Sequence, residues 1–144
     1  MEDESRLFVD ANYFIALLNP ADKLHGNARE IAGMLEREKR PLVISNLVFL
    51  EIVTILSQRG GKTVAIEGGK YLLLHPFIQQ IHIDEWLHSE SWRVFQEVSA
   101  KNISFIDCST IAVMNAENIA SLLTFDFTDF KTLRKKHHFE FFSV

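Results

Sequence analysis

Residues 42–56 read LVISNLVFLEIVTIL, and this stretch decides the fold class. Residues 42–45 are mostly apolar and suit a short buried strand that follows a break at Pro41. The next residues have the composition of a buried helix, which we expect to end near Gly60-Gly61, because glycine commonly closes a helix. A strand that runs directly into a helix indicates an α/β protein.

Glu51 is the exception in this stretch, because it is a carboxylate between Leu50 and Ile52. Removing an ionised carboxylate from water costs on the order of several kcal/mol unless it is paired. Glu51 lies about five residues inside the helix, too far to act as an N-cap. It either shares a solvent-facing stripe with Thr54 and Gln58 or faces a partner at a functional site. In the second case, apolar neighbours would pack the helix against the sheet: Leu50, Ile52, Val53 and Leu56.

Strand and helix patterns alternate along the rest of the chain. Further strands are predicted at 6–9, 77–83, 119–125 and 139–144. Helices are predicted at 11–18, 62–74 and 106–117, although Gly68-Gly69 interrupts 62–74. Further helices are predicted after Asp22 and after Asp84, which would cap them, and a short helix is predicted before the last strand. This alternation predicts a three-layer α/β/α sandwich with a mostly parallel central sheet, in one domain spanning residues 1–144.

Composition favours a soluble globular protein, with 47% hydrophobic and 24% charged residues. The single cysteine, Cys108, provides neither an internal disulfide nor a cysteine pair for zinc, which fits a reducing, cytoplasmic setting. The first residues, MEDESR, are polar and acidic, so we expect no signal peptide. No apolar run approaches the roughly 20 residues of a membrane span.

Several acidic residues fall near predicted strand ends. Asp10 follows the first strand, Asp107 opens a helix, and Asp126 ends a strand with Asp129 three residues on. Each aspartate alone also fits a helix N-cap, which stabilises by about 1 kcal/mol. In α/β folds ligands bind outside the carboxyl ends of the strands, so these acids and Glu51 would converge. Clustered anions need a cation between them, and oxygen-only ligands select Mg²⁺ or Mn²⁺.

Four stretches of the chain resemble the acidic motifs of the PIN-domain family, in order and over nearly the whole sequence. They are LFVDANYFIALLNP (7–20), SNLVFLEIVTIL (45–56), ISFIDCSTIAVM (103–114) and LLTFDFTDF (122–130). The chain is most similar to single-domain VapC-type toxins of toxin–antitoxin operons. The resemblance places the family's acids, as catalytic residues and metal ligands, on Asp10, Glu51, Asp107 and Asp126. The family's polar residue two positions after the first acid falls on Asn12.

Two positions differ from the pattern or leave it open. Cys108 stands where a small residue such as alanine is common in the family. The fourth motif contains both Asp126 and Asp129. Asp126 is favoured because it directly follows the predicted strand, and Asp129 is the other candidate for a metal ligand, either through a bound water or as a simple cap.

The resemblance implies an endoribonuclease that uses Mg²⁺ or Mn²⁺ to hydrolyse phosphodiester bonds. In this reading Asn12 contacts a carboxylate or the scissile phosphate. The resemblance also implies a homodimer and, for the toxin-like members, an antitoxin protein that crosses the active site. A housekeeping RNA-processing nuclease without an antitoxin, or an inactive module that binds RNA or protein, are the alternatives. A phosphoacceptor domain is disfavoured because only one acid follows the first strand and no lysine follows the last.

The net charge of −4 is unusual for a protein that grips phosphates. Setting the four site acids aside brings this charge to zero. The segment KTLRKKHH (131–138) then contributes Lys131 and Arg134 as candidates for binding the RNA backbone. The other interpretation is a solvated basic helix end that interacts with its own dipole.

Overall fold

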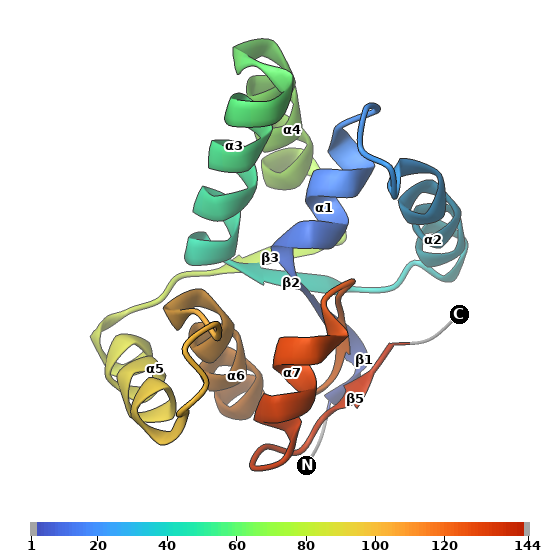
Figure 1. Cartoon of the computed structure of the whole chain (residues 1–144). Helices are drawn as coiled ribbons and strands as arrows, with labels where there is room; N and C mark the ends of the chain where they lie inside the picture. The colour runs from blue at the N-terminus through green and yellow to red at the C-terminus, as the bar shows by residue number, and fades with distance from the viewer. Residues whose placement is uncertain (1–2, 143–144) are drawn as a thin grey trace.

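A computed structural model describes residues 3–142 and contains one five-stranded sheet in the order β3-β2-β1-β4-β5 (Figure 1). Every neighbouring pair of strands is parallel, which confirms the predicted α/β class. The strands are β1 (Asp3–Val9), β2 (Leu42–Ser45), β3 (Ile78–Ile81), β4 (Ile119–Leu123) and β5 (Glu140–Phe141).

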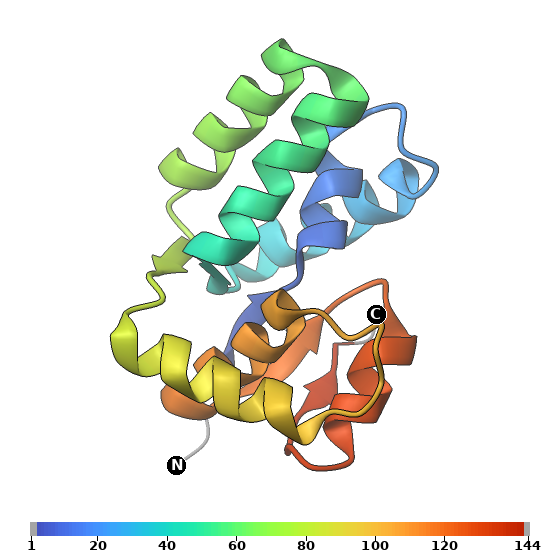
Figure 2. The same ribbon diagram turned by 60° about the vertical axis from the view of Figure 1, so that its left-hand side comes forward.

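Helices cover both faces of this sheet and confirm the three-layer arrangement. Figures 1 and 2 show α1 to α4 on one face and α5 to α7 on the other. None of the helices in the described part of the chain is long and apolar enough to span a membrane. The helices are α1 (Ala11–Leu18), α2 (His25–Glu38), α3 (Asn46–Gly60), α4 (Lys62–Leu74), α5 (Glu85–Glu97), α6 (Phe105–Glu117) and α7 (Phe127–Arg134).

The central strand β1 sets the position of any ligand site. It pairs with β2 through Leu7 and Leu42, and with β4 on its other side through Leu7 and Ser121. The chain builds β2 and β3 outward from one edge of β1, then returns to place β4 and β5 on the other. The carboxyl ends of β1 and β4 therefore form the switch point at which α/β sheets bind ligands.

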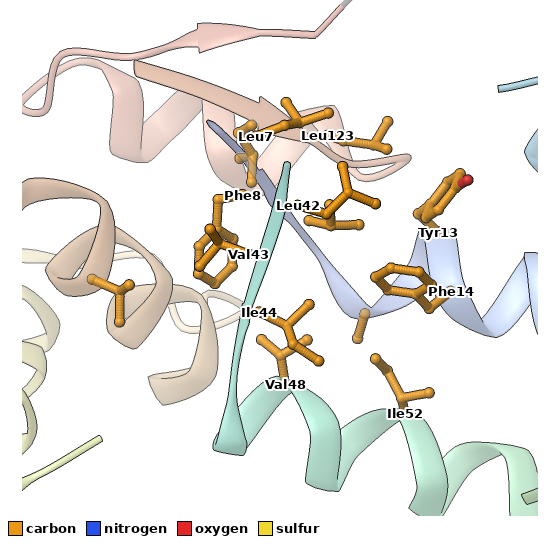
Figure 3. Packing of buried hydrophobic residues seen from close by; sticks show 14 of the residues in the cluster. Leu7, Phe8, Tyr13, Phe14, Leu42, Val43, Ile44, Val48, Ile52 and Leu123 are labelled. Carbon is orange, nitrogen blue, oxygen red and sulfur yellow. The ribbon is translucent and has the colours of Figure 1, made fainter. Parts of the chain in front are cut away.

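One part of the core forms where α3 and α1 pack on the sheet. Val48, Ile52 and Leu56 are fully buried and repeat every four residues, so they form one face of α3. Figure 3 shows Val48 and Ile52 close to Ile44 of β2 and Phe14 of α1. The prediction that Leu50 packs against the sheet is wrong, because its side chain is 56% exposed and points away from this face.

Several predicted element ends differ from the structure. β3 covers only part of 77–83, and β4 ends at Leu123 instead of residue 125. Asp22 does not cap α2. Its carboxylate accepts the Leu24 backbone N–H within a turn (2.9 Å), and α2 begins afterwards at His25. β5 is shorter than the predicted strand 139–144, of which residues 143 and 144 lie outside the described part.

The two adjacent glycines of α4 do not interrupt the helix, which continues from Lys62 to Leu74. A Cβ atom on Gly68 would lie 2.7 Å from Leu56 Cδ1, so α3 approaches α4 too closely there for a larger residue. Gly61, with φ of +93°, makes the sharp turn between the two helices. The glycines thus serve close helix packing, which outweighs their low helix propensity.

Candidate active site

Asp10 is the most buried acid of the candidate site, with 6% of its surface exposed. Its backbone N–H donates to the Leu123 carbonyl (2.9 Å), which joins the end of β1 to the end of β4. Its Oδ1 atom accepts the Ala11 N–H (2.9 Å), so Asp10 caps α1 as predicted. Capping and a site role therefore coexist, because the second carboxylate oxygen remains for other contacts.

Thr124 connects the first and fourth motifs, although the sequence analysis assigned it no role. Its buried hydroxyl donates to Asp10 Oδ2 (2.8 Å) and accepts the Asp126 N–H (2.9 Å). Asn12 completes this network, because Nδ2 donates to Thr124 Oγ1 (3.3 Å) and Oδ1 accepts the Phe125 N–H (3.1 Å). The available signal in the sequence was a hydroxyl residue directly after an apolar strand.

Asp107 lies in the first turn of α6, three residues beyond the true N-cap, which is Ser104. The Ser104 hydroxyl accepts the Asp107 N–H (3.0 Å), and Asp107 Oδ2 accepts the Ser104 N–H (3.3 Å). This reciprocal capping box fixes the aspartate at the start of the helix. The alternative that Asp107 is itself the N-cap is therefore wrong.

Glu51 lies on the side of α3 that faces the same cavity as Asp10. Ile55 and Arg59, four and eight residues further on, line this cavity with it. Thr54 and Gln58 instead line a different groove, between α3 and α4. Glu51 therefore does not belong to a solvent-facing stripe with those two residues, which removes the simpler of the two interpretations.

The cavity at the switch point has a volume of about 400 Å³ and brings the predicted acids together. A groove of about 620 Å³ between α3 and α4 is larger but has no carboxylate among its described lining residues. The acidic cavity is the better candidate because chemistry, not volume, distinguishes an active site. Its polar lining consists of Asp10, Asn12, Asp22, Lys23, Glu51, Arg59, Ser104, Asp107 and Asp126.

The remaining candidates lie outside this cavity lining. Asp129 lies in the first turn of α7, half-buried and close enough to Asp107 for their charges to interact. Lys131 and Arg134 follow on α7, and Arg134 donates to Glu140 Oε2 (2.8 Å) while lying over the Phe141 ring. A role for Lys131 and Arg134 in binding RNA stays a prediction.

Burial and mutual repulsion both disfavour the charged forms of these acids. Burial raises the pKa of Asp10 to about 7, and the charges of Asp107 and Glu51 add to this, while the Thr124 hydrogen bond opposes it. Burial likewise raises the pKa of Asp107 to about 6, with Asp129 and Glu51 contributing. Burial also raises the pKa of Glu51. The site therefore holds more negative charge than its own surroundings compensate.

The donor chemistry of the cavity fits a hard divalent cation. As the side chains stand, residues 3–142 contain no group of three or more His, Cys, Asp and Glu side chains that could hold a metal ion. Yet the candidate ligands are all carboxylate oxygens, and burial, with a smaller contribution from their mutual repulsion, raises the pKa of Asp10 and of Asp107. Mg²⁺ and Mn²⁺ prefer such ligands and would relieve the repulsion.

Fold and cavity together define an all-parallel α/β protein with a carboxylate site at the switch point of its sheet. Sequence comparison identifies the class further. The family model of the PIN domain matches residues 7–136, and the chain belongs to this family.

The relatives of the chain include characterised nucleases and toxins. It is 30% identical over 121 residues to the 23S rRNA-specific endonuclease VapC20 of Mycobacterium tuberculosis, covering 83% of this chain and 88% of VapC20. The crystal structure of M. tuberculosis VapC20, described as a Sarcin-Ricin loop cleaving toxin, superposes with a TM-score of 0.76 at 27% identity, covering 87% of this chain and 93% of that one.

Two toxin–antitoxin structures share the fold at lower identity. VapBC2 from Rickettsia felis, bound to a DNA fragment from its promoter, has a TM-score of 0.63 at 17% identity, covering 96% of this chain and 99% of the matched one. A toxin–antitoxin complex from Klebsiella pneumoniae has a TM-score of 0.60 at 17% identity, covering 86% and 89%. These matches support the PIN-like fold.

Proposed function

We propose that the chain is a Mg²⁺- or Mn²⁺-dependent endoribonuclease acting at the site of Asp10, Glu51, Asp107 and Asp126. The observation that carries this proposal is the convergence of four carboxylates, from four separate segments, on one cavity at the switch point. Membership of the PIN domain family and similarity to an rRNA-specific endonuclease support RNA as the substrate.

The four carboxylates differ in how the chain holds them. Asp10 and Asp107 are held at helix starts by backbone N–H donors, so they are the candidates for direct metal ligands. Glu51 and Asp126 would complete the ligand set or orient water. A bound divalent cation lowers the pKa of water and stabilises negative charge on the phosphate. The residues thus supply position and charge for hydrolysis, with no side-chain nucleophile required.

Asn12 is held in place by the same network, which bears on its predicted contact with substrate. Its Oδ1 is engaged by Phe125, and Nδ2 donates to Thr124. An amide nitrogen carries two hydrogens, so one donor of Asn12 is left for a phosphate oxygen. Asn12 would therefore connect the segments that follow β1 and β4 and contact the substrate at the same time.

Metal-dependent cleavage is the first test of this function. Purified wild-type protein is incubated with labelled RNA, including ribosomal RNA, in Mg²⁺, in Mn²⁺ and in EDTA. We expect cleavage with either metal, none in EDTA, and none by Asp10→Asn at wild-type concentration. Equal cleavage by wild type and Asp10→Asn would show that the activity is a contaminant and would overturn the assignment.

We further propose that this nuclease is the toxin of a type II toxin–antitoxin pair and works as a homodimer. The similarity to VapC20, described as a toxin, supports this role over the housekeeping alternative. Induced expression should arrest growth, and co-expression of a neighbouring antitoxin gene should restore it. Growth unaffected by an active nuclease would favour the housekeeping role, and light scattering would test the dimer.

The buried, free Cys108 suits the reducing cytoplasm in which such an enzyme would act.

A further inference from the structure

We infer that Lys23 and Arg59 bind phosphates next to the one that is cut, so that RNA leaves the carboxylates along α1 and α3. This inference rests on the proposed ribonuclease function and adds the residues that hold its substrate. Lys131 and Arg134, the candidates for backbone binding in the sequence, lie outside the acidic cavity. Lys23 and Arg59 line the cavity itself.

Arg59 occupies the far end of the α3 face that carries Glu51. The two residues are eight positions apart, with Ile55 midway, and all three line the cavity. Eight residues of an α-helix rise about 12 Å, and helical side chains lean back toward the N-terminus. Arg59 thus shares the cavity with Glu51 but starts far enough from it to meet a neighbouring phosphate.

Lys23 has the matching position relative to Asp10. Asp10 immediately precedes α1, and Lys23 lies in the turn that follows this helix of eight residues, which rises about 12 Å. Within the turn, Asn19 and Asp22 each accept a backbone N–H through their side chains (3.1 and 2.9 Å). These bonds hold the turn in one shape, so the origin of the Lys23 side chain is fixed.

The parallel course of the two helices gives the cavity an acidic and a basic end. Figures 1 and 2 show α1 and α3 side by side, both leading away from the sheet. Their near ends carry Asp10 and Glu51, and Lys23 and Arg59 follow at their far ends. A polyanion that places one phosphate at the carboxylates with a cation would therefore meet uncompensated positive charge one or two nucleotides further on.

Neither cation is engaged by the described part of the chain. The side chains of Lys23 and Arg59 make no hydrogen bond or ion pair with any of residues 3–142. Asp22 lies next to Lys23 and lines the same cavity, but its carboxylate accepts the Leu24 N–H. Arg134, in contrast, is already bound to Glu140. Two unpaired cations beside a cluster of acids are explained by a substrate that brings its own negative charge.

Binding and cleavage assays separate this inference from the proposed function. In an Asp10→Asn background that cannot cut, affinity for fluorescent single-stranded RNA is measured by anisotropy at several KCl concentrations. Adding Lys23→Ala or Arg59→Ala should weaken binding roughly 3- to 10-fold and reduce the slope of log affinity against log salt by about 0.7 per residue. Lys23→Arg and Arg59→Lys should restore most of the affinity.

Two further arms complete the design. Arg37→Ala, an exposed cation on α2 outside the cavity, is the matched control, and Lys131→Ala with Arg134→Ala tests the α7 segment. Each substitution is also made in the enzyme with Asp10 intact. There Lys23→Ala and Arg59→Ala should raise KM and leave kcat within about twofold of wild type. Circular dichroism should show an unchanged melting temperature.

The outcomes are distinguishable. A wild-type protein that does not cut RNA with either metal refutes the proposed function, while the binding assay still decides the role of the cations. Unchanged affinity and salt slope in the Lys23→Ala and Arg59→Ala variants overturn the inference. If only the α7 variants lose affinity, the RNA backbone lies over α7 and not along α1 and α3.

Discussion

The Thr124 hydroxyl donates a 2.8 Å hydrogen bond to Asp10 Oδ2 across a separation of 114 residues. The Thr124 Oγ1 atom in turn accepts the Asp126 N–H at 2.9 Å. One buried hydroxyl therefore sets the spacing between the first and the fourth acid of the site. The hydrogen bond also favours the ionised form of Asp10, opposing the effect of burial on its pKa.

Thr124→Val should impair both the site and the fold, because valine keeps the shape but removes the hydroxyl. Asp10 and the Asp126 N–H would each lose a buried partner, which costs about 1–3 kcal/mol in unfolding free energy. Metal affinity and cleavage should fall roughly 10- to 100-fold, as for other residues that orient metal ligands. Urea unfolding and Mn²⁺ calorimetry measure the two effects. Thr124→Ser, which keeps the hydroxyl, is the control and should stay near wild type.

Asp10→Asn should stabilise the metal-free protein at high pH and not at low pH. Burial raises the Asp10 pKa from 3.8 to about 7, so between these values the folded state holds a proton that the unfolded state has lost. Wild-type stability therefore falls as pH rises through this window, by an amount on the order of 2–4 kcal/mol. Asparagine does not titrate, so the variant lacks this loss.

Thermal melts in EDTA at pH 4, 6 and 8 measure the difference. The variant should melt close to wild type at pH 4 and clearly above it at pH 8. Asp107, whose pKa is raised to about 6, also lowers the stability of the folded state as pH rises. It does so in both proteins, so its contribution cancels when they are compared. A difference that does not depend on pH would show that Asp10 is already charged in the folded state at pH 4.

Glu51→Leu should leave the metal-free fold intact or stabilise it, while abolishing metal-dependent cleavage. Glu51 has a raised pKa from burial and makes no side-chain hydrogen bond within the described residues. Removing it relieves repulsion with Asp10 and Asp107. Denaturant unfolding and RNA cleavage are measured in parallel, with Thr54→Leu on the opposite groove as the control. An unfolded Glu51→Leu protein would contradict the metal interpretation of this residue.

Asp126 should matter more than Asp129 for cleavage. Asp126 lines the acidic cavity, whereas Asp129 does not and acts on Asp107 through its charge. We expect Asp126→Asn to lower kcat/KM about 100-fold or more, and Asp129→Asn about 10-fold or less. Steady-state cleavage at saturating Mg²⁺ compares the two variants. The reverse order would identify Asp129 as the fourth acid of the site.

The two glycines of α4 should respond oppositely to alanine. A Cβ on Gly68 would lie 2.7 Å from buried Leu56, so Gly68→Ala should destabilise by about 1–3 kcal/mol through overpacking. A Cβ on Gly69 would have its nearest neighbour at 3.4 Å, on Val53, and alanine is about 1 kcal/mol better in a helix. Gly69→Ala should therefore raise the melting temperature. Equal effects of both changes would mean that α3 and α4 separate freely.

The architecture was largely predictable because its signals are local. Alternating strand and helix patterns predicted the parallel sheet, and Asp84 was correctly predicted as the cap of α5. At two places where sequence and structure disagree, a contact between distant segments decides the outcome. Thr124 and Phe125 have strand-like composition, yet they leave the sheet because they bond to Asp10 and Asn12. Gly68 suggested a helix break, yet it allows two helices to meet.

The candidate site was predictable only in part for the same reason. Asp10, Glu51, Asp107 and Asp126 were grouped through their positions relative to strands and through family resemblance, and the structure places all four on one cavity. Lys23 and Arg59 gave no sign in the sequence, since a cation in a turn and one at a helix end are ordinary surface residues. Their significance depends on two helices lying side by side, which no local pattern reveals.

The strand order has a consequence for how the protein is made. β1 lies at the centre of the sheet, yet its partner β4 is translated long after it. Until residues 119–126 have been translated, Asp10 lacks both the neighbouring strand β4 and the Thr124 hydroxyl. A nascent chain or a prematurely released fragment therefore cannot assemble the carboxylates. Under the proposed function, the catalytic potential of the chain is latent until residues 119–126 have been made.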